Sequence, residues 1–255
     1  MKYWTLLIIG LLLFTDCQTE TPDNEVEQES NAIIEAAQSD SKVKNYSGTI
    51  EGKFPIEVQL VTEGNRIQGF YLYRKGEILL PIKGVKKEHN KIELAAYDET
   101  AGTVEIFIGE INDNTISGEW FDKRAETTAF AKFSFAETSM ELPQEDILAM
   151  KGTYESEING YTSVVVIEPI GNKTVKIQVM TVYGSCTGEI TGEAFIYDSN
   201  HLNFYGEENS FLNIYFDNNT VSLYEIACSY HHGFKCNFNG KYTKVSDESN
   251  WIISG

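Results

Sequence analysis

From residue 46 onward, polar and apolar residues alternate in short runs that are separated by turn residues. One such run is Val-Glu-Ile-Phe-Ile at 104–108. Because successive side chains of a strand point to opposite faces, this alternation predicts half-buried β-strands. Gly, Asn and Asp interrupt the runs about every 8–12 residues, a spacing typical of an antiparallel barrel or sandwich. Asp-Asn-Asn at 217–219 predicts a tight hairpin, because Asn and Asp tolerate the left-handed backbone of such turns.

Two segments with this pattern predict an all-β fold of two small antiparallel β-barrel or sandwich domains. The first domain is predicted at 45–137, with about eight strands, and the second at 151–245. Residues 138–150 show no alternation and are predicted to be a linker, in which Pro143 suits the first turn of a short helix. Residues 246–255 are predicted to be a tail. The strands expected in the second domain lie at 161–170, 174–183, 186–197, 202–205, 210–216, 221–228 and 236–244.

Near the start of the chain, Lys2 precedes a mainly apolar run at 3–14, and Cys17 comes shortly after this run. The run is shorter than the ~20 apolar residues of a membrane-spanning helix, and it has the length of a signal-peptide core. An apolar run that ends at such a cysteine resembles the lipobox of bacterial lipoproteins, in the loose form of the Bacteroidota. The resemblance implies that residues 1–16 are a signal peptide and that Cys17 is diacylated at the mature N-terminus. A secreted protein without lipid and an uncleaved anchor are the alternatives.

The stretch at 17–44, which starts at the lipid-bearing cysteine, contains seven acidic residues, two lysines and no aromatic residue. This composition predicts a disordered acidic tether between the lipid and the first domain. Acidic residues soon after the cysteine also resemble the surface-export signal of Bacteroidota lipoproteins. We therefore expect a protein of the cell envelope that is held in the outer membrane by its N-terminal lipid, on the periplasmic or the surface face.

Charge and motifs exclude several classes of function. The chain carries 38 Asp and Glu against 20 Lys and Arg, a net charge of -18. A nucleic-acid-binding protein needs a basic face, so we expect no nucleic-acid partner. The sequence contains no G-x-S-x-G, H-E-x-x-H, Walker or G-x-G-x-x-G motif. We therefore expect a protein without cofactor and without enzymatic activity.

Three cysteines remain after Cys17, and a disulfide is predicted between Cys228 and Cys236. They flank His232 symmetrically, so a hairpin in which Gly233 takes a positive φ would set them opposite each other. The competing pairing joins Cys186 to one of these two cysteines, since an odd count leaves one over. A zinc site is the further alternative, with ligands in the pattern C-x2-H-H-x3-C at Cys228, His231, His232 and Cys236. Because export favours oxidation, the disulfide is preferred and no metal is expected.

Aromatic and basic side chains supply the candidate binding residues. An exposed row of aromatic rings suits a glycan or a protein partner, and a local basic turn suits an anionic polymer. The residues selected on this basis are Tyr71, Tyr73, Trp120, Lys86 and Lys87. Two carboxylates could also flank a glycosidic bond beside Trp120, although solvated acids on strands and turns are the simpler interpretation. The acidic residues concerned are Glu93, Asp98, Glu99, Glu105, Glu110 and Glu119.

Two weaker resemblances bear on function. The runs Gly-Lys-Phe-Pro-Ile at 52–56 and Ile-Ser-Gly-Glu-Trp at 116–120 resemble a β-rich module of exported bacterial proteins. Cys-Thr-Gly at 186–188 and the stretch at 228–242 resemble small periplasmic β-domains associated with lysozyme inhibition. We therefore expect a binding module for an envelope protein or glycan. An inhibitor of a cell-wall hydrolase is the alternative, and a lipocalin-like carrier of a small apolar ligand stays open because eight-stranded barrels can hold one.

Overall fold

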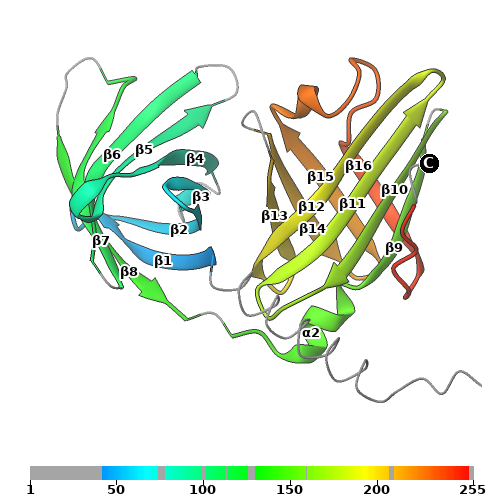
Figure 1. The fold of residues 1–255 in the computed structure, drawn as a ribbon, viewed down its shortest axis with the longest axis horizontal. Coiled ribbons are helices and arrows are strands. Elements are labelled where there is room, and N and C mark those ends of the chain that lie inside the picture. The colour runs from blue at the N-terminus through cyan, green and yellow to red at the C-terminus, as the bar shows by residue number, and fades with distance from the viewer. Residues whose placement is uncertain are drawn as a thin grey trace, which may run out of the picture.

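The computed structural model describes residues 42–73, 78–98, 102–112, 114–125, 130–139, 141–158, 160–206 and 210–252. These residues form two closed antiparallel barrels of eight strands each (Figure 1). The predicted all-β class with two small domains is confirmed, and of the two predicted architectures the chain adopts the barrel. No helix within these ranges is both long and apolar enough to cross a membrane.

Barrel 1 is an up-and-down meander in which every strand pairs with the next and β8 closes onto β1. Side chains that alternate along the strands fill its interior, as the period-two pattern requires. At the centre, the ring of Phe107 lies 5.4 Å from that of Tyr71 and 5.3 Å from that of Phe133. The strands are β1 (Val43–Ile50), β2 (Phe54–Glu63), β3 (Arg66–Tyr73), β4 (Ile78–Lys86), β5 (Lys91–Asp98), β6 (Gly102–Asn112), β7 (Thr115–Asp122) and β8 (Ala131–Thr138).

Barrel 2 repeats this topology, and its β16 closes onto β9. Buried aliphatic side chains such as Val165, Ile177 and Leu212 fill its interior. The sequence did not predict β9, whose Thr-Tyr-Glu-Ser-Glu run at 153–157 contains a single large apolar residue. The strands are β9 (Gly152–Ile158), β10 (Tyr161–Pro169), β11 (Thr174–Tyr183), β12 (Cys186–Asp198), β13 (His201–Tyr205), β14 (Phe211–Asp217), β15 (Thr220–Ile226) and β16 (Gly240–Ser246).

The linker between the barrels is part of the core of barrel 2. Helix α2 (Gln144–Ala149) begins directly after Pro143, as predicted. Ile147 and Met150 are both buried in the core cluster of barrel 2, and the Tyr154 hydroxyl donates a hydrogen bond to the Met150 carbonyl at 2.9 Å. The helix therefore plugs the lower end of barrel 2 in the view of Figure 1.

The C-terminal tail packs on the outer wall of barrel 2. Gln178 and Ile252 exchange two hydrogen bonds of 2.8 Å, one from the Gln178 amide to the Ile252 carbonyl and one from the Ile252 N–H to the Gln178 amide oxygen. The Ser249 hydroxyl donates to the Ile167 carbonyl at 2.7 Å. The described part of the tail is therefore held against β10 and β11.

The two barrels meet through the outer faces of β2 and β3 in barrel 1 and of β12 to β14 in barrel 2. Gln59 of β2 is fully buried in this joint. Its amide nitrogen donates to Asn45 Oδ1 at 3.1 Å and to the Ile196 carbonyl at 2.9 Å. Its amide oxygen accepts from the Tyr205 hydroxyl at 3.1 Å and from Asn203 Nδ2 at 3.5 Å. One side chain thus connects both barrels by hydrogen bonds.

An aromatic contact accompanies this polar one. Phe70 points outward from barrel 1, yet it is fully buried because barrel 2 covers it. Its ring lies 4.9 Å from that of Tyr197 and 6.4 Å from that of Phe211. The Tyr197 hydroxyl also donates to the Glu57 carboxylate of barrel 1. Apolar burial and hydrogen bonds therefore hold the barrels in one arrangement.

Candidate functional site

The loop between β15 and β16 crosses the mouth of barrel 2, and we call residues 227–239 the closing loop. It starts where Ala227 takes the left-handed conformation, with φ 55°. It then runs beside the start of β12, where the Glu189 N–H donates to the His231 carbonyl at 3.0 Å and the Gly233 N–H donates to the Thr187 carbonyl at 3.3 Å. The closing loop therefore continues the sheet of barrel 2 beside the start of β12, which β13 does not reach.

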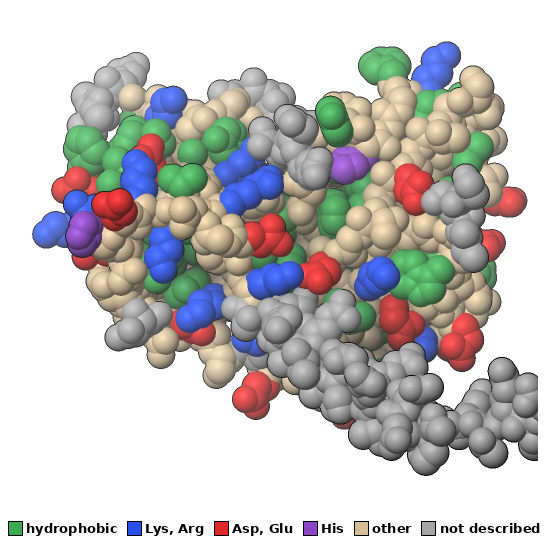
Figure 2. All heavy atoms as spheres, viewed as in Figure 1, with side chains coloured by type: hydrophobic (Ala, Val, Ile, Leu, Met, Phe, Trp, Pro, Cys, Tyr) green, Lys and Arg blue, Asp and Glu red, His purple; other side chains and the backbone are tan. Residues whose placement is uncertain are grey.

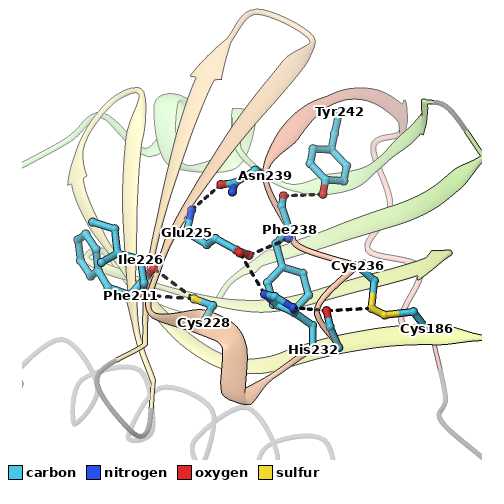
Figure 3. A network of polar contacts seen from close by, with 11 residues as sticks. Cys186, Phe211, Glu225, Ile226, Cys228, His232, Cys236, Phe238, Asn239 and Tyr242 are labelled. Carbon is cyan, nitrogen blue, oxygen red and sulfur yellow. Dashed lines mark hydrogen bonds and ion pairs between the residues drawn. A yellow bond between two sulfur atoms is a disulfide. The ribbon is translucent and has the colours of Figure 1, made fainter. Parts of the chain in front are cut away.

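A disulfide joins Cys236 of the closing loop to Cys186 of β12, 50 residues away in sequence (Figure 3). The predicted Cys228–Cys236 disulfide is wrong, whereas the competing pairing through Cys186 is confirmed. The predicted hairpin does not form, because Ala227 rather than Gly233 takes the positive φ and the loop turns toward β12. Cys228 keeps its thiol, which is buried and donates to the Phe211 carbonyl at 3.3 Å.

A carboxylate and an imidazole hold the closing loop from inside (Figure 3). Glu225 accepts hydrogen bonds from His232 Nε2 at 3.0 Å and from the Phe238 N–H at 2.8 Å. His232 Nδ1 lies 2.8 Å from the Gly233 carbonyl oxygen. Both ring nitrogens thus face oxygen atoms, one of a carboxylate and one of a backbone carbonyl. The side chains of His232 and Glu225 are nearly buried, which favours this pairing.

The predicted zinc alternative is wrong. Cys236 is oxidised in the disulfide and supplies no thiolate. The two histidines turn to different partners, because His231 Nε2 lies 2.9 Å from Ser210 Oγ whereas His232 faces Glu225. In the part of the chain that the structure describes, no group of three His, Cys, Asp or Glu side chains could hold a metal ion.

The exposed side chains of the closing loop include Tyr230, Phe234 and Lys235, which we call the loop tip. The exposed fraction is 98% for Phe234 and 71% for Tyr230. Among the large apolar side chains that the structure describes, Phe234 is the most exposed and Tyr230 the next. Sequence analysis missed this residue because the sequence alone does not separate exposed from buried aromatic residues.

A second polar cluster lies inside barrel 1 around Glu105, which is fully buried. Its carboxylate accepts hydrogen bonds from Trp120 Nε1 at 2.8 Å, from Arg124 Nη2 at 2.5 Å, from the Tyr73 hydroxyl at 3.2 Å and from the Tyr71 hydroxyl. Burial, followed by the charge of Glu105, raises the pKa of Tyr71 and of Tyr73 well above the usual range of tyrosine. These groups stabilise the charge of Glu105 within the barrel.

This cluster changes the interpretation of three predicted binding residues. Tyr71 is fully buried, so the prediction that it contacts a ligand at the surface is wrong. Tyr73 and Trp120 are half-buried and already donate to Glu105. Side chains on β3 alternate between two faces, and the sequence alone did not show which face points into barrel 1. In the structure Tyr71 points inward, whereas Phe70 points outward against barrel 2.

The predicted basic turn lies at the opposite end of barrel 1. Lys86 is half-buried at the end of β4. Lys87 is exposed, and its ammonium group pairs with the carboxylate of Glu93. Binding of an anionic polymer by these lysines stays a prediction.

The predicted acidic residues do not gather as a catalytic pair. Glu105 is buried inside barrel 1, Asp98 is half-buried, and Glu99 lies outside the described residues; Glu93, Glu110 and Glu119 are exposed. The carboxylate opposite Glu105 across β6 and β7 is Asp122, and Arg124 binds both. Hydrogen bonds from Arg124 lower the pKa of Asp122, whereas a general acid needs a raised pKa.

Comparisons with protein-family models, with curated proteins and with solved structures find no match for this chain. Within the described residues, the closing loop combines a backbone that a disulfide holds with exposed apolar and basic side chains.

Removing the Cys186–Cys236 disulfide should destabilise the protein by about 4 kcal/mol, because this bond closes a long loop of the unfolded chain. Urea unfolding of the double variant Cys186→Ala/Cys236→Ala measures this loss. Cys228→Ala is the matched control that keeps the disulfide. Thiol labelling of unfolded, unreduced protein 18–255 should modify Cys228 alone, and labelling of Cys186 instead would contradict the pairing.

Alkaline pH should destabilise barrel 1. The raised pKa of Tyr71 means that its contribution to stability is complete below the ordinary tyrosine pKa of about 10 and is lost as pH rises further. Above pH 10 the Tyr71→Phe variant should therefore lose stability less steeply than the wild type, by about 1.4 kcal/mol per pH unit. Urea unfolding between pH 8 and 11.5, with exposed Tyr230→Phe as control, tests this, and parallel slopes for all three proteins would refute it.

Proposed function

We propose that this protein is a non-enzymatic, lipid-anchored protein of the cell envelope that docks another envelope protein through the loop tip. The observation that carries the proposal is the exposure of Phe234, at 98%, on a loop that a disulfide and the Glu225–His232 pair hold in place. An aromatic side chain that is presented by a preformed backbone loses little conformational entropy on binding. Such side chains are typical anchors of protein interfaces.

The loop tip also indicates what the partner offers. The apolar ring of Phe234 is surrounded by solvent and therefore fits a concave apolar pocket of a partner. Tyr230 adds a second exposed ring, which carries a hydroxyl group. Lys235 lies next in the chain and suits a carboxylate at the rim of that pocket. The expected partner is a protein with an apolar pocket beside acidic residues.

A pull-down with immobilised protein 18–255 against envelope extracts tests this docking. A partner retained by the wild type should be retained at least tenfold less by Phe234→Ser, because about 2 kcal/mol or more is typical of a central aromatic anchor. Phe54→Ser is the matched control, since Phe54 is also exposed but lies on barrel 1. Retention that is equal for Phe234→Ser and the wild type, or no retained protein at all, would overturn the proposal.

Inhibition of a cell-wall hydrolase is the second candidate, and the same loop tip supports it. Glycan hydrolases carry paired carboxylates in a cleft, which matches the pocket expected for Phe234 and Lys235. In this case the protein should slow peptidoglycan hydrolysis by a muramidase, and Phe234→Ser should restore the rate. The filled interiors of both barrels give less support to a carrier of apolar ligands.

The lipid anchor is proposed on the resemblance of the N-terminal run to a lipobox. Growth of the source bacterium, or of a related host that expresses the full chain, on radiolabelled palmitate should label the protein. Cys17→Ser should abolish the label, because the thioether-linked lipid needs the thiol, whereas Cys228→Ala should retain it. Equal labelling of Cys17→Ser and the wild type, or an unlabelled wild type, would contradict the anchor.

A further inference from the structure

A groove with a volume of about 540 Å³ lies along the seam between the two barrels. This size falls in the range of small-molecule binding sites. Its walls come from both barrels, so the joint around Gln59 determines its shape. The lining residues are Lys42, Val61, Glu63, Arg66 and Gln68 from barrel 1 and Thr191, Gly192, Glu193, Phe195, Phe204, Tyr205, Gly206 and His231 from barrel 2.

The charges of this lining balance. Lys42 and Arg66 supply two positive charges, and Glu63 and Glu193 supply two negative ones. Lys42 and Glu193 also form an ion pair across the seam at 3.3 Å. Figure 2 shows basic, acidic and histidine side chains gathered along this seam. A multiply charged anion or cation would need an excess of the opposite charge, so the balance favours an uncharged ligand.

The polar groups of the lining include both donors and acceptors. In the amide orientation that its neighbours favour, Gln68 accepts hydrogen bonds from Arg66 Nε at 2.5 Å and from Arg66 Nη2 at 2.7 Å. This contact fixes the planar guanidinium group at the edge of the groove and leaves further N–H donors on it. The carboxylate of Glu63 is an acceptor, and the hydroxyl of Thr191, which donates to Glu189 Oε1 at 3.4 Å, can accept as well.

An apolar floor lies beneath these groups. Phe195 packs with Val43 and Val61 from barrel 1, and its ring lies 6.0 Å from that of Tyr205. Gly192 and Gly206 lie beside the ring of Phe204, where a Cβ atom on either glycine would come within 2.9 Å of that ring. The glycines thus allow the backbone to pass close to this ring, which, like that of Phe195, is buried beneath the groove.

We propose that this groove binds a neutral oligosaccharide. Each sugar hydroxyl both donates and accepts hydrogen bonds, which matches the mixture of donors and acceptors in the lining. The C–H face of a sugar ring fits against Tyr205, the half-buried ring of the floor. The proposed ligand and the protein partner of the loop tip use different surfaces, so this proposal goes beyond the docking function and does not depend on it.

Screening of protein 18–255 on an array of neutral and anionic glycans, followed by calorimetric titration with the best neutral trisaccharide, tests the proposal. We expect saturable binding of a neutral glycan. Arg66→Ala should weaken binding at least tenfold, and Thr191→Trp should abolish it by filling the groove. Lys53→Ala removes an exposed lysine of barrel 1 and should leave binding unchanged, as should Phe234→Ser at the loop tip.

Circular dichroism and thermal unfolding first confirm that each variant is folded. An array that binds no neutral glycan would overturn the proposal. Binding that survives both Arg66→Ala and Thr191→Trp in folded protein would also overturn it, because the ligand would then lie elsewhere. Loss of glycan binding in Phe234→Ser would place the ligand at the loop tip and would contradict the groove.

Discussion

The buried amide of Gln59 is the interaction on which the relation between the two barrels depends. It takes part in four hydrogen bonds, one within barrel 1 and three to barrel 2. A buried polar group that loses its partner costs about 1–3 kcal/mol, so sliding one barrel against the other is unfavourable. Phe70 adds apolar burial beside it, since its outward-pointing ring lies among rings of barrel 2. The contacts of Gln59 and Phe70 therefore determine the position of one barrel against the other as well as stabilising their contact.

Both proposed binding surfaces depend on how the barrels are closed and joined. The groove has walls from two barrels, so a hinge between them would remove its shape. The closing loop owes its position to barrel 2, through the Cys186–Cys236 disulfide and the hydrogen bonds of Glu225. Helix α2 plugs the other end of barrel 2, where Ile147 and Met150 enter its core. The chain therefore combines filled, closed barrels with contact groups that lie outside them.

Local patterns predicted much of the fold. Alternation predicted the strands other than β9, the turn residues predicted the hairpin at which Asn218 has φ 54°, and Pro143 predicted the start of α2. Features that depend on distant contacts were not predictable. The disulfide partner of Cys236 lies 50 residues away in sequence. The alternation of side chains along β3 could not show which of its two faces points into the barrel. The groove has no sequence signal, because its residues come together only through the joint.

The most direct test of a rigid joint is the measurement of backbone residual dipolar couplings for both barrels of protein 18–255 in one aligned sample. If the Gln59 and Phe70 contacts hold the barrels as one body, the couplings of barrel 1 and barrel 2 fit a single alignment tensor in the geometry described above. Two tensors that differ in magnitude or orientation would show independent motion of the barrels and would contradict the account.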